Sequence, residues 1–151
     1  MKKQVYGLEV RIQLIRESKD VKSPIVKSPE DVYKLVEHLK DCDREQFLTI
    51  CLSIKNEVLS IETTSIGTLS ANLVHPREVF KTAILQNAAG IIVAHNHPSG
   101  DPTPSEEDLA ITKRLFEASK IMDIALLDHV IIGNGSFKSL KEIGKIGSGY
   151  E

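Results

Sequence analysis

The residues best suited to chemistry lie in one short segment, which runs from His95 through a loop rich in Pro and Gly to Asp108. His95 and His97 are two positions apart after an apolar run, so in an extended chain their side chains point to the same side. Asp108 follows in the first turn of a predicted helix. Two imidazoles and one carboxylate can hold zinc and leave a fourth position for water, as catalytic zinc sites do. We therefore predict a zinc site at His95, His97 and Asp108.

A hydrolytic metal site also needs a group that accepts a proton and a donor for the developing oxyanion. Glu62, late in a predicted strand, is the candidate base, and Glu57 and Glu78 are the alternatives. Ser105, three residues before Asp108, is the candidate oxyanion donor. The spacing Ser105-x-x-Asp108 is also that of a helix capping box, and capping alone would explain both residues.

Other chemistries fit the sequence less well. The letters His-Asn-His spell the name of a nuclease motif, but that motif spreads its residues over a longer unit. Cys42 and Cys51 precede the histidines and lack the Pro-Cys-x-x-Cys spacing of a zinc deaminase. Asp128 and His129 are neighbours in an apolar strand and must point to opposite faces, so they cannot both enter the site. We expect His129 to be a core residue or to contact one of the metal-binding residues, rather than to bind the metal itself.

The helices around this segment are predicted from capping signals. Ser28 is the expected N-cap of a first helix, with Pro29 at its first position and Asp31 completing a capping box. A second helix opens at Pro76, and a third begins after Ser105. These helices alternate with runs of strand-forming residues, which predicts that sheet and helices share one core.

The predicted strands cover residues 8–14, 47–54, 57–63, 90–95 and 125–132, with a short edge strand near Phe137. The run after Gly90 is apolar without alternation, which indicates a strand buried on both faces. We predict an α/β fold, bordering on α+β, with a mixed sheet flanked by helices. In it, Glu62 could face a parallel neighbour that ends at His95, and strand 47–54 could be an edge that pairs with another copy.

Composition limits the remaining choices. The 151 residues suit one domain, with 41% hydrophobic and 26% charged residues. A formal net charge of −2 argues against a protein that binds nucleic acid mainly through phosphates. The chain has neither a long apolar run nor a recognisable signal peptide, so we expect a cytoplasmic protein without a membrane span.

At this point the sequence resembles the JAMM (MPN-domain) metallopeptidase superfamily, whose pattern is an upstream Glu, then H-x-H, seven residues, Ser, two residues and Asp. It resembles the RadC-like branch more closely. The supporting stretches are Pro76-Arg77-Glu78, HNHPSGDPTPS from residue 95, DLAITKR from residue 108, and Leu127-Asp128-His129. The resemblance covers residues 28–143, with residues 1–27 as an N-terminal strand and loop of the same domain and 144–151 as a frayed tail.

The resemblance implies a cytidine-deaminase-like fold with zinc bound by His95, His97 and Asp108. It implies Glu62 as the base and Ser105 as the oxyanion stabiliser. The peptidases usually carry Ser or Thr between the two histidines, and the Asn found here is usual for the RadC-like branch. Full-length RadC-like proteins also carry a helix-hairpin-helix region, for which this chain has too few residues before the motif.

The leading hypothesis is therefore a zinc hydrolase that cuts an amide or isopeptide bond in a protein or peptide. One alternative is a non-catalytic interaction module, although such modules have usually lost metal ligands. The other is a DNA-repair-associated factor of the RadC type, which the net charge disfavours. The sequence does not indicate the substrate or the oligomeric state.

Overall fold

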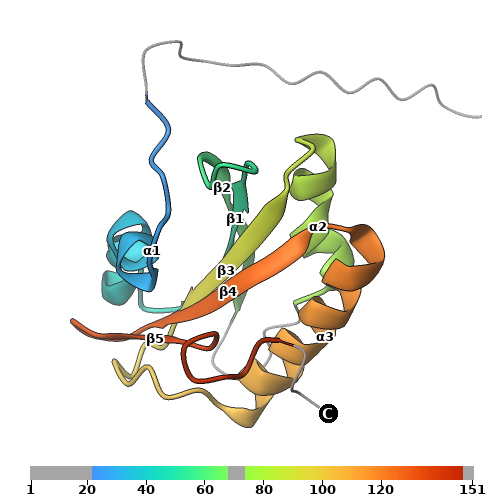
Figure 1. Cartoon of the computed structure of the whole chain (residues 1–151). Coiled ribbons are helices and arrows are strands. Elements are labelled where there is room, and N and C mark those ends of the chain that lie inside the picture. The colour runs from blue at the N-terminus through green and yellow to red at the C-terminus, as the bar shows by residue number, and fades with distance from the viewer. Residues whose placement is uncertain (1–21, 68–73, 148–151) are drawn as a thin grey trace, which may run out of the picture.

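The computed structural model describes residues 22–67 and 74–147, which form a five-stranded mixed sheet between two layers of helix (Figure 1). The elements in chain order are α1 (Pro29–Val36), the 3-10 helix η1 (Glu37–Asp41), β1 (Glu45–Leu52), β2 (Val58–Gly67), α2 (Pro76–Leu85), β3 (Gly90–Asn96), α3 (Glu106–Met122), β4 (Ala125–Ile132) and β5 (Phe137–Ser139). The sheet order is β2-β1-β3-β4-β5, with β3 and β4 parallel and the other pairs antiparallel. The α/β class and the mixed sheet predicted from the sequence are confirmed. The predicted strand 8–14 and residues 148–151 of the predicted tail lie outside the described residues.

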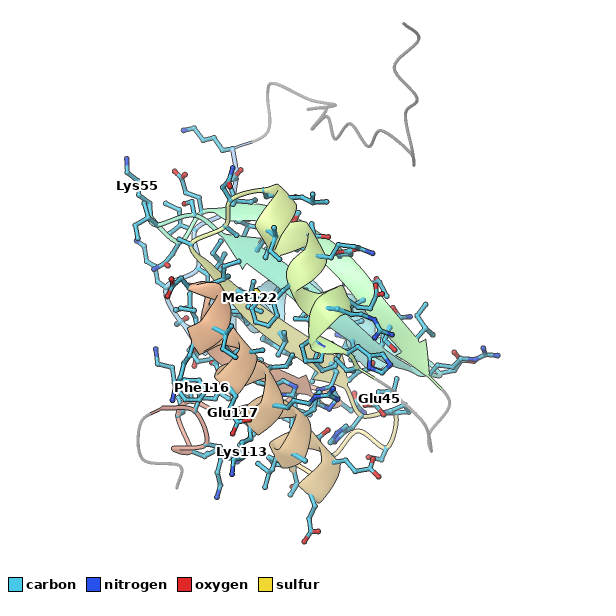
Figure 2. All side chains as sticks on the ribbon, turned by 90° about the vertical axis from the view of Figure 1, so that its right-hand side faces the viewer. Glu45, Lys55, Lys113, Phe116, Glu117 and Met122 are labelled. Atoms are coloured by element: carbon cyan, nitrogen blue, oxygen red, sulfur yellow. The ribbon has the colours of Figure 1, made fainter. Side chains whose placement is uncertain are left out.

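Each face of the sheet has its own apolar core. On one face, α1 and η1 pack against Leu48, Ile50 and Ile92. On the other, α2 and α3 pack against Phe47, Val93 and their neighbours. Figure 2 looks onto this second face, where the two long helices lie in front of the strands. All seven residues of β3 are buried, because the strand lies in the middle of the sheet and is covered on both sides.

Local signals set the helix starts where they were predicted. The Ser28 Oγ accepts a hydrogen bond from the Asp31 amide, and the Asp31 carboxylate accepts one from the Ser28 amide. Ser105 and Asp108 form the same reciprocal pair at the start of α3. These capping boxes satisfy backbone amides that have no partner inside the helix.

The position of β1 differs from the prediction. The hairpin of residues 47–63 forms, but β1 pairs with β2 on one side and with β3 on the other, so it is not an edge strand. Its residues 47–52 are all buried, whereas burial alternates along much of β2, which is an edge strand of the sheet. An unbroken apolar run belongs in the interior of a sheet and an alternating one at its border. This order also means that Glu62 of β2 has no direct pairing with β3.

Among the helices of the described residues, none is both long enough and apolar enough to cross a membrane.

Candidate metal centre

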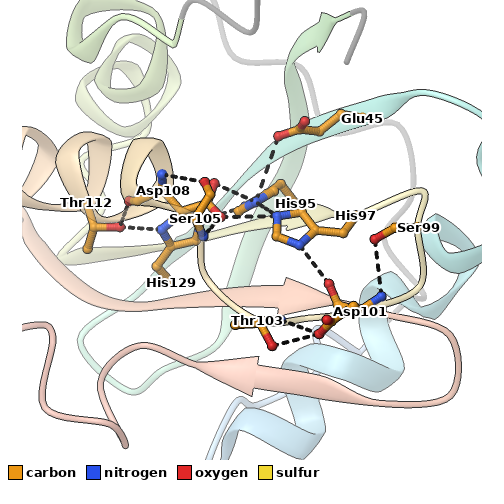
Figure 3. Close-up of polar contacts among 10 residues, drawn as sticks. All are labelled: Glu45, His95, His97, Ser99, Asp101, Thr103, Ser105, Asp108, Thr112 and His129. Atoms are coloured by element: carbon orange, nitrogen blue, oxygen red, sulfur yellow. Dashed lines mark hydrogen bonds and ion pairs between the residues drawn. The ribbon is translucent and has the colours of Figure 1, made fainter. Parts of the chain in front are cut away.

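The three predicted ligands meet at one point. The His95 Nε2 lies 3.0 Å from the His97 Nε2 and 3.0 Å from Oδ1 of Asp108, and the His97 Nε2 lies 3.1 Å from Oδ2 of Asp108 (Figure 3). Ligand atoms of the three residues all lie within 4.8 Å of one another. β3 carries His95 near its end, His97 follows at the start of the loop, and the first turn of α3 supplies Asp108. The end of β3 and the N-terminus of α3 thus place the three side chains at the same end of the sheet.

Asp108 serves both the helix cap and this cluster. Its Oδ2 accepts a hydrogen bond from the Ser105 amide at 2.8 Å, while its Oδ1 faces His95. The Ser105 Oγ in turn accepts a hydrogen bond from the Asp108 amide at 3.1 Å. Oδ2 therefore serves the cap and also faces His97, whereas Oδ1 takes no part in the cap, so a capped Asp108 can still offer an oxygen to a metal ion.

The orientation of His97 follows from its second ring nitrogen. Its Nδ1 lies 2.8 Å from the backbone carbonyl oxygen of Asp101, which can only accept a hydrogen bond. His97 therefore carries a proton on Nδ1, and in its neutral form its Nε2 has a lone pair that points at Asp108. This is the arrangement in which a histidine binds zinc, with the far nitrogen donating to a fixed acceptor.

The electrostatics of the cluster favour a positive charge at its centre. Burial by itself would raise the pKa of Asp108, but the hydrogen bonds that His95 and His97 donate when their rings are protonated outweigh it and hold that pKa well below its usual range. The hydrogen bond to Asp108 raises the pKa of His97. Imidazole nitrogens and a carboxylate oxygen are the ligands that zinc prefers, so the residues present fit a zinc ion.

The carboxylates predicted as candidate bases lie elsewhere in the sheet and helices. Glu62 pairs across the strands with Thr49, and its side chain accepts a hydrogen bond from the hydroxyl of Thr82 in α2. Glu57 is exposed beside the hairpin turn, and Glu78 forms an ion pair with Lys81 in α2. The role of Glu62 as the base stays a prediction.

Glu45 is a carboxylate beside the cluster that sequence reasoning missed. Its Oε1 lies 3.8 Å from the His95 Nε2, and its side chain is 20% exposed. Because β1 runs antiparallel to β3 with Phe47 opposite His95, Glu45 lies on the same face as Phe47 and reaches the end of β3. Glu45 stands two residues before the apolar run of β1, and only the pairing of β1 with β3 brings it to the cluster, so local sequence patterns did not distinguish it.

The residue between the two histidines holds Glu45 in place. Asn96 is buried, and its side chain accepts a hydrogen bond from the Gln46 amide at 2.7 Å and donates one to the Arg44 carbonyl at 3.0 Å. Its amide therefore binds the backbone on both sides of Glu45. Replacing Asn96 with a smaller hydroxyl residue would remove one or both of these contacts.

The loop between His97 and Asp108 is held against the turn that follows β4. The Gly100 carbonyl accepts a hydrogen bond from the Asn134 amide at 2.9 Å, and the His97 amide donates to the Ile132 carbonyl at 2.9 Å. A Cβ at Gly133 would lie 2.4 Å from the Gly100 carbonyl oxygen, so only glycine fits there. The loop is thus anchored at its start and near its middle.

Asp128 and His129 face opposite sides of the sheet, as predicted. The Asp128 carboxylate accepts hydrogen bonds from Ser139, Lys141 and the His129 amide. It borders a cavity of about 450 Å³ that Val32 and Ile92 line on the α1 side, away from the cluster. The His129 ring instead lies against His95 on the α3 side. Only His129 therefore belongs to the surroundings of the predicted metal site.

Comparison with known proteins identifies the family of this chain. Residues 26–145 match the family model for the RadC-like JAB domain. A UPF0758 protein of Desulforamulus reducens is 58% identical over 123 residues, covering 81% of this chain and 54% of that protein. One from Caldanaerobacter subterraneus is 56% identical over 120 residues, covering 79% and 52%, respectively. The chain spans about half the length of these relatives. It belongs to the RadC-like JAB domain family.

Proposed function

We propose that this chain is a zinc-dependent hydrolase of the JAMM type, which cuts an amide or isopeptide bond in a protein or peptide. The observation that carries the proposal is the convergence of His95, His97 and Asp108 with a second carboxylate, that of Glu45, beside them. A domain that only bound other proteins would have no need for a carboxylate next to three ligands. The arrangement therefore favours catalysis over a purely interacting role.

In this proposal each residue has a defined task. His95 and His97 through Nε2, and Asp108 through a carboxylate oxygen, hold the ion. When bound, zinc acidifies water and polarises a carbonyl group. Glu45 accepts the proton of the attacking water at Oε1 and returns it to the leaving amine. The Ser105 Oγ accepts its hydrogen bond from the Asp108 amide, so its own hydrogen can be donated to the developing oxyanion.

Two matched substitutions test the function and the choice of base. Glu45→Gln should retain zinc but lower kcat by roughly 10²–10⁴-fold, because it removes a proton acceptor while preserving size. Glu62→Gln, the same change on the neighbouring strand β2, should leave kcat unchanged. Zinc content is measured by elemental analysis, and turnover with fluorogenic peptides joined through either an α-amide or a lysine ε-amide bond.

If Glu62→Gln lost turnover and Glu45→Gln kept it, Glu62 would be the base. Purified protein that took up no zinc after chelation and re-addition of the metal would contradict the hydrolase proposal and favour an interaction module. A gel shift with duplex DNA at low salt tests the remaining alternative, and a complex that dissolves as salt is added would support a nucleic-acid role.

A further inference from the structure

A buried hydrogen-bonded chain lies behind the proposed metal site and connects His95 to the backbone of α3. The His95 Nδ1 lies 2.7 Å from the His129 Nε2, and the His129 Nδ1 lies 2.6 Å from the Thr112 Oγ1. The Thr112 hydroxyl donates to the Asp108 carbonyl at 2.6 Å (Figure 3). We call Thr112, His129 and His95 the relay.

The protons of the relay can be placed one at a time. A carbonyl oxygen only accepts, so the single hydroxyl hydrogen of Thr112 is used on Asp108. The Thr112 oxygen must then accept from His129, which puts a proton on the His129 Nδ1. A neutral His129 therefore has a lone pair on Nε2, and this lone pair accepts the Nδ1 proton of His95.

The last step decides the state of the metal ligand. With its proton on Nδ1, a neutral His95 carries a lone pair on Nε2. This atom faces the His97 Nε2 and the Asp108 Oδ1. If His129 instead donated from its Nε2 to the His95 Nδ1, the hydrogen of a neutral His95 would be on Nε2, and that atom could not bind a metal. His129 cannot take this other tautomer while the Thr112 hydroxyl donates to the Asp108 carbonyl, because the Thr112 oxygen then has no hydrogen left to donate to the His129 Nδ1.

The surroundings keep His129 neutral and the rings in place. His129 is completely buried, and burial disfavours a charged imidazole. The Phe47 ring stacks on His95 with centroids 5.8 Å apart and meets His129 edge-on at 5.5 Å. Among the described residues, the ring nitrogens of this tightly packed His129 make only the two hydrogen bonds of the relay.

We propose that His129 and Thr112 are positioning residues, which fix the tautomer of His95 so that its Nε2 is always ready to bind metal. The proposal rests on the metal site of the proposed function and does not require hydrolysis. Zinc-binding histidines usually donate their second N–H to a carboxylate, a carbonyl or water. Here His129 is the acceptor. The Asp108 carbonyl of α3, acting through Thr112, determines which nitrogen of His129 carries the hydrogen.

The test removes only the hydroxyl that orients the relay. Thr112→Val has the same shape and leaves His129 free to take the other tautomer, and Thr112→Ser restores the hydroxyl. Thr49→Val is the matched control, because Thr49 is also buried and its hydroxyl bonds Thr64 away from the relay. All variants are studied as the full chain.

Two measurements are made on these proteins. Nitrogen-15 NMR of the zinc-free protein at mildly alkaline pH should show a proton on the His95 Nδ1 in the wild type, Thr112→Ser and Thr49→Val. Thr112→Val should show a proton on Nε2 in part or all of the molecules. Zinc affinity, measured by competition with a chromogenic chelator, should fall about 10–100-fold in Thr112→Val alone.

The outcomes separate this inference from the proposed function. If Thr112→Val keeps both the tautomer and the zinc affinity of the wild type, the positioning role is overturned while the hydrolase proposal stands. If the wild type takes up zinc and shows the expected tautomer but cleaves no peptide, the positioning role stands and hydrolysis fails. If the zinc-free wild type carries its proton on the His95 Nε2, the inference is overturned directly.

Discussion

Asp128 shows at the scale of one residue how burial makes stability depend on pH. Its carboxylate accepts two backbone N–H groups at Oδ1 and the Ser139 hydroxyl at Oδ2. Burial raises its pKa, and these hydrogen bonds offset the effect only in part. The folded state therefore binds a proton more tightly than the unfolded state does. Its contribution to stability is largest at low pH and decreases as pH rises from the ordinary aspartate pKa through the raised one.

Asp128→Asn should abolish this part of the pH dependence. Asparagine keeps the two N–H bonds at Oδ1 and can donate to the Ser139 Oγ, so only the Ser139 hydroxyl hydrogen loses its acceptor. We expect the stability of the variant relative to the wild type to be lowest in acid and to rise as pH approaches neutrality. Urea unfolding at a series of pH values measures this, with the exposed Asp41→Asn as the control. A variant curve parallel to that of the wild type would contradict the assignment.

At the scale of the elements, the two capping boxes provide a comparison inside one molecule. Ser28 with Asp31 and Ser105 with Asp108 make the same pair of hydrogen bonds at the starts of α1 and α3. Only the second pair lies at the proposed site. A difference between equivalent substitutions at the two serines therefore reports on chemistry and not on capping.

We predict that Ser105→Ala and Ser105→Gly will separate the two roles of this serine. Loss of the cap should cost about 1 kcal/mol in the Ala variant and a few tenths in the Gly variant, and the same at Ser28. If the Ser105 hydroxyl stabilises an oxyanion, both Ser105 variants should lose roughly 10²–10³-fold in kcat. Thermal unfolding and peptide turnover measure the two effects. If Ser105→Gly had the activity of the wild type, the role of Ser105 would be limited to capping α3.

The elements also show what could be read from the sequence. Helix starts at Ser28 and Ser105 follow from residues three positions apart, and the buried β3 follows from its composition, so both were predictable. The order of strands depends on pairing between distant segments, and local patterns carry little of that information. Glu62 and Glu45 are both strand carboxylates, and only the place of β1 beside β3 distinguishes them.

At the scale of the whole molecule, the proposed site exists only in the folded chain. Its residues come from β1, β3, α3 and β4, which are brought together by the sheet order. An ion held by such a set binds the native state and not the unfolded one. Metal binding and folding must therefore be coupled.

Zinc should accordingly stabilise the protein. At free zinc about 100-fold above Kd the expected gain is about 2.7 kcal/mol. For a chain of this length that corresponds to a rise in Tm of about 5–10 °C. Differential scanning fluorimetry with zinc and with a chelator measures the shift. Asp108→Asn should lose most of it, whereas Asp101→Asn, an exposed carboxylate in the same loop, should retain it. Equal shifts in both variants would place the ion elsewhere.

The contact between Gly133 and Gly100 has a practical consequence for anyone who mutates or redesigns this domain. Gly133 touches no ligand and lies after β4, yet any side chain there would push against the loop that joins His97 to Asp108. A saturation scan should therefore find this glycine among its least tolerant positions, although its own atoms do no chemistry. Libraries that vary the loop between His97 and Asp108 should therefore leave this point of contact unchanged.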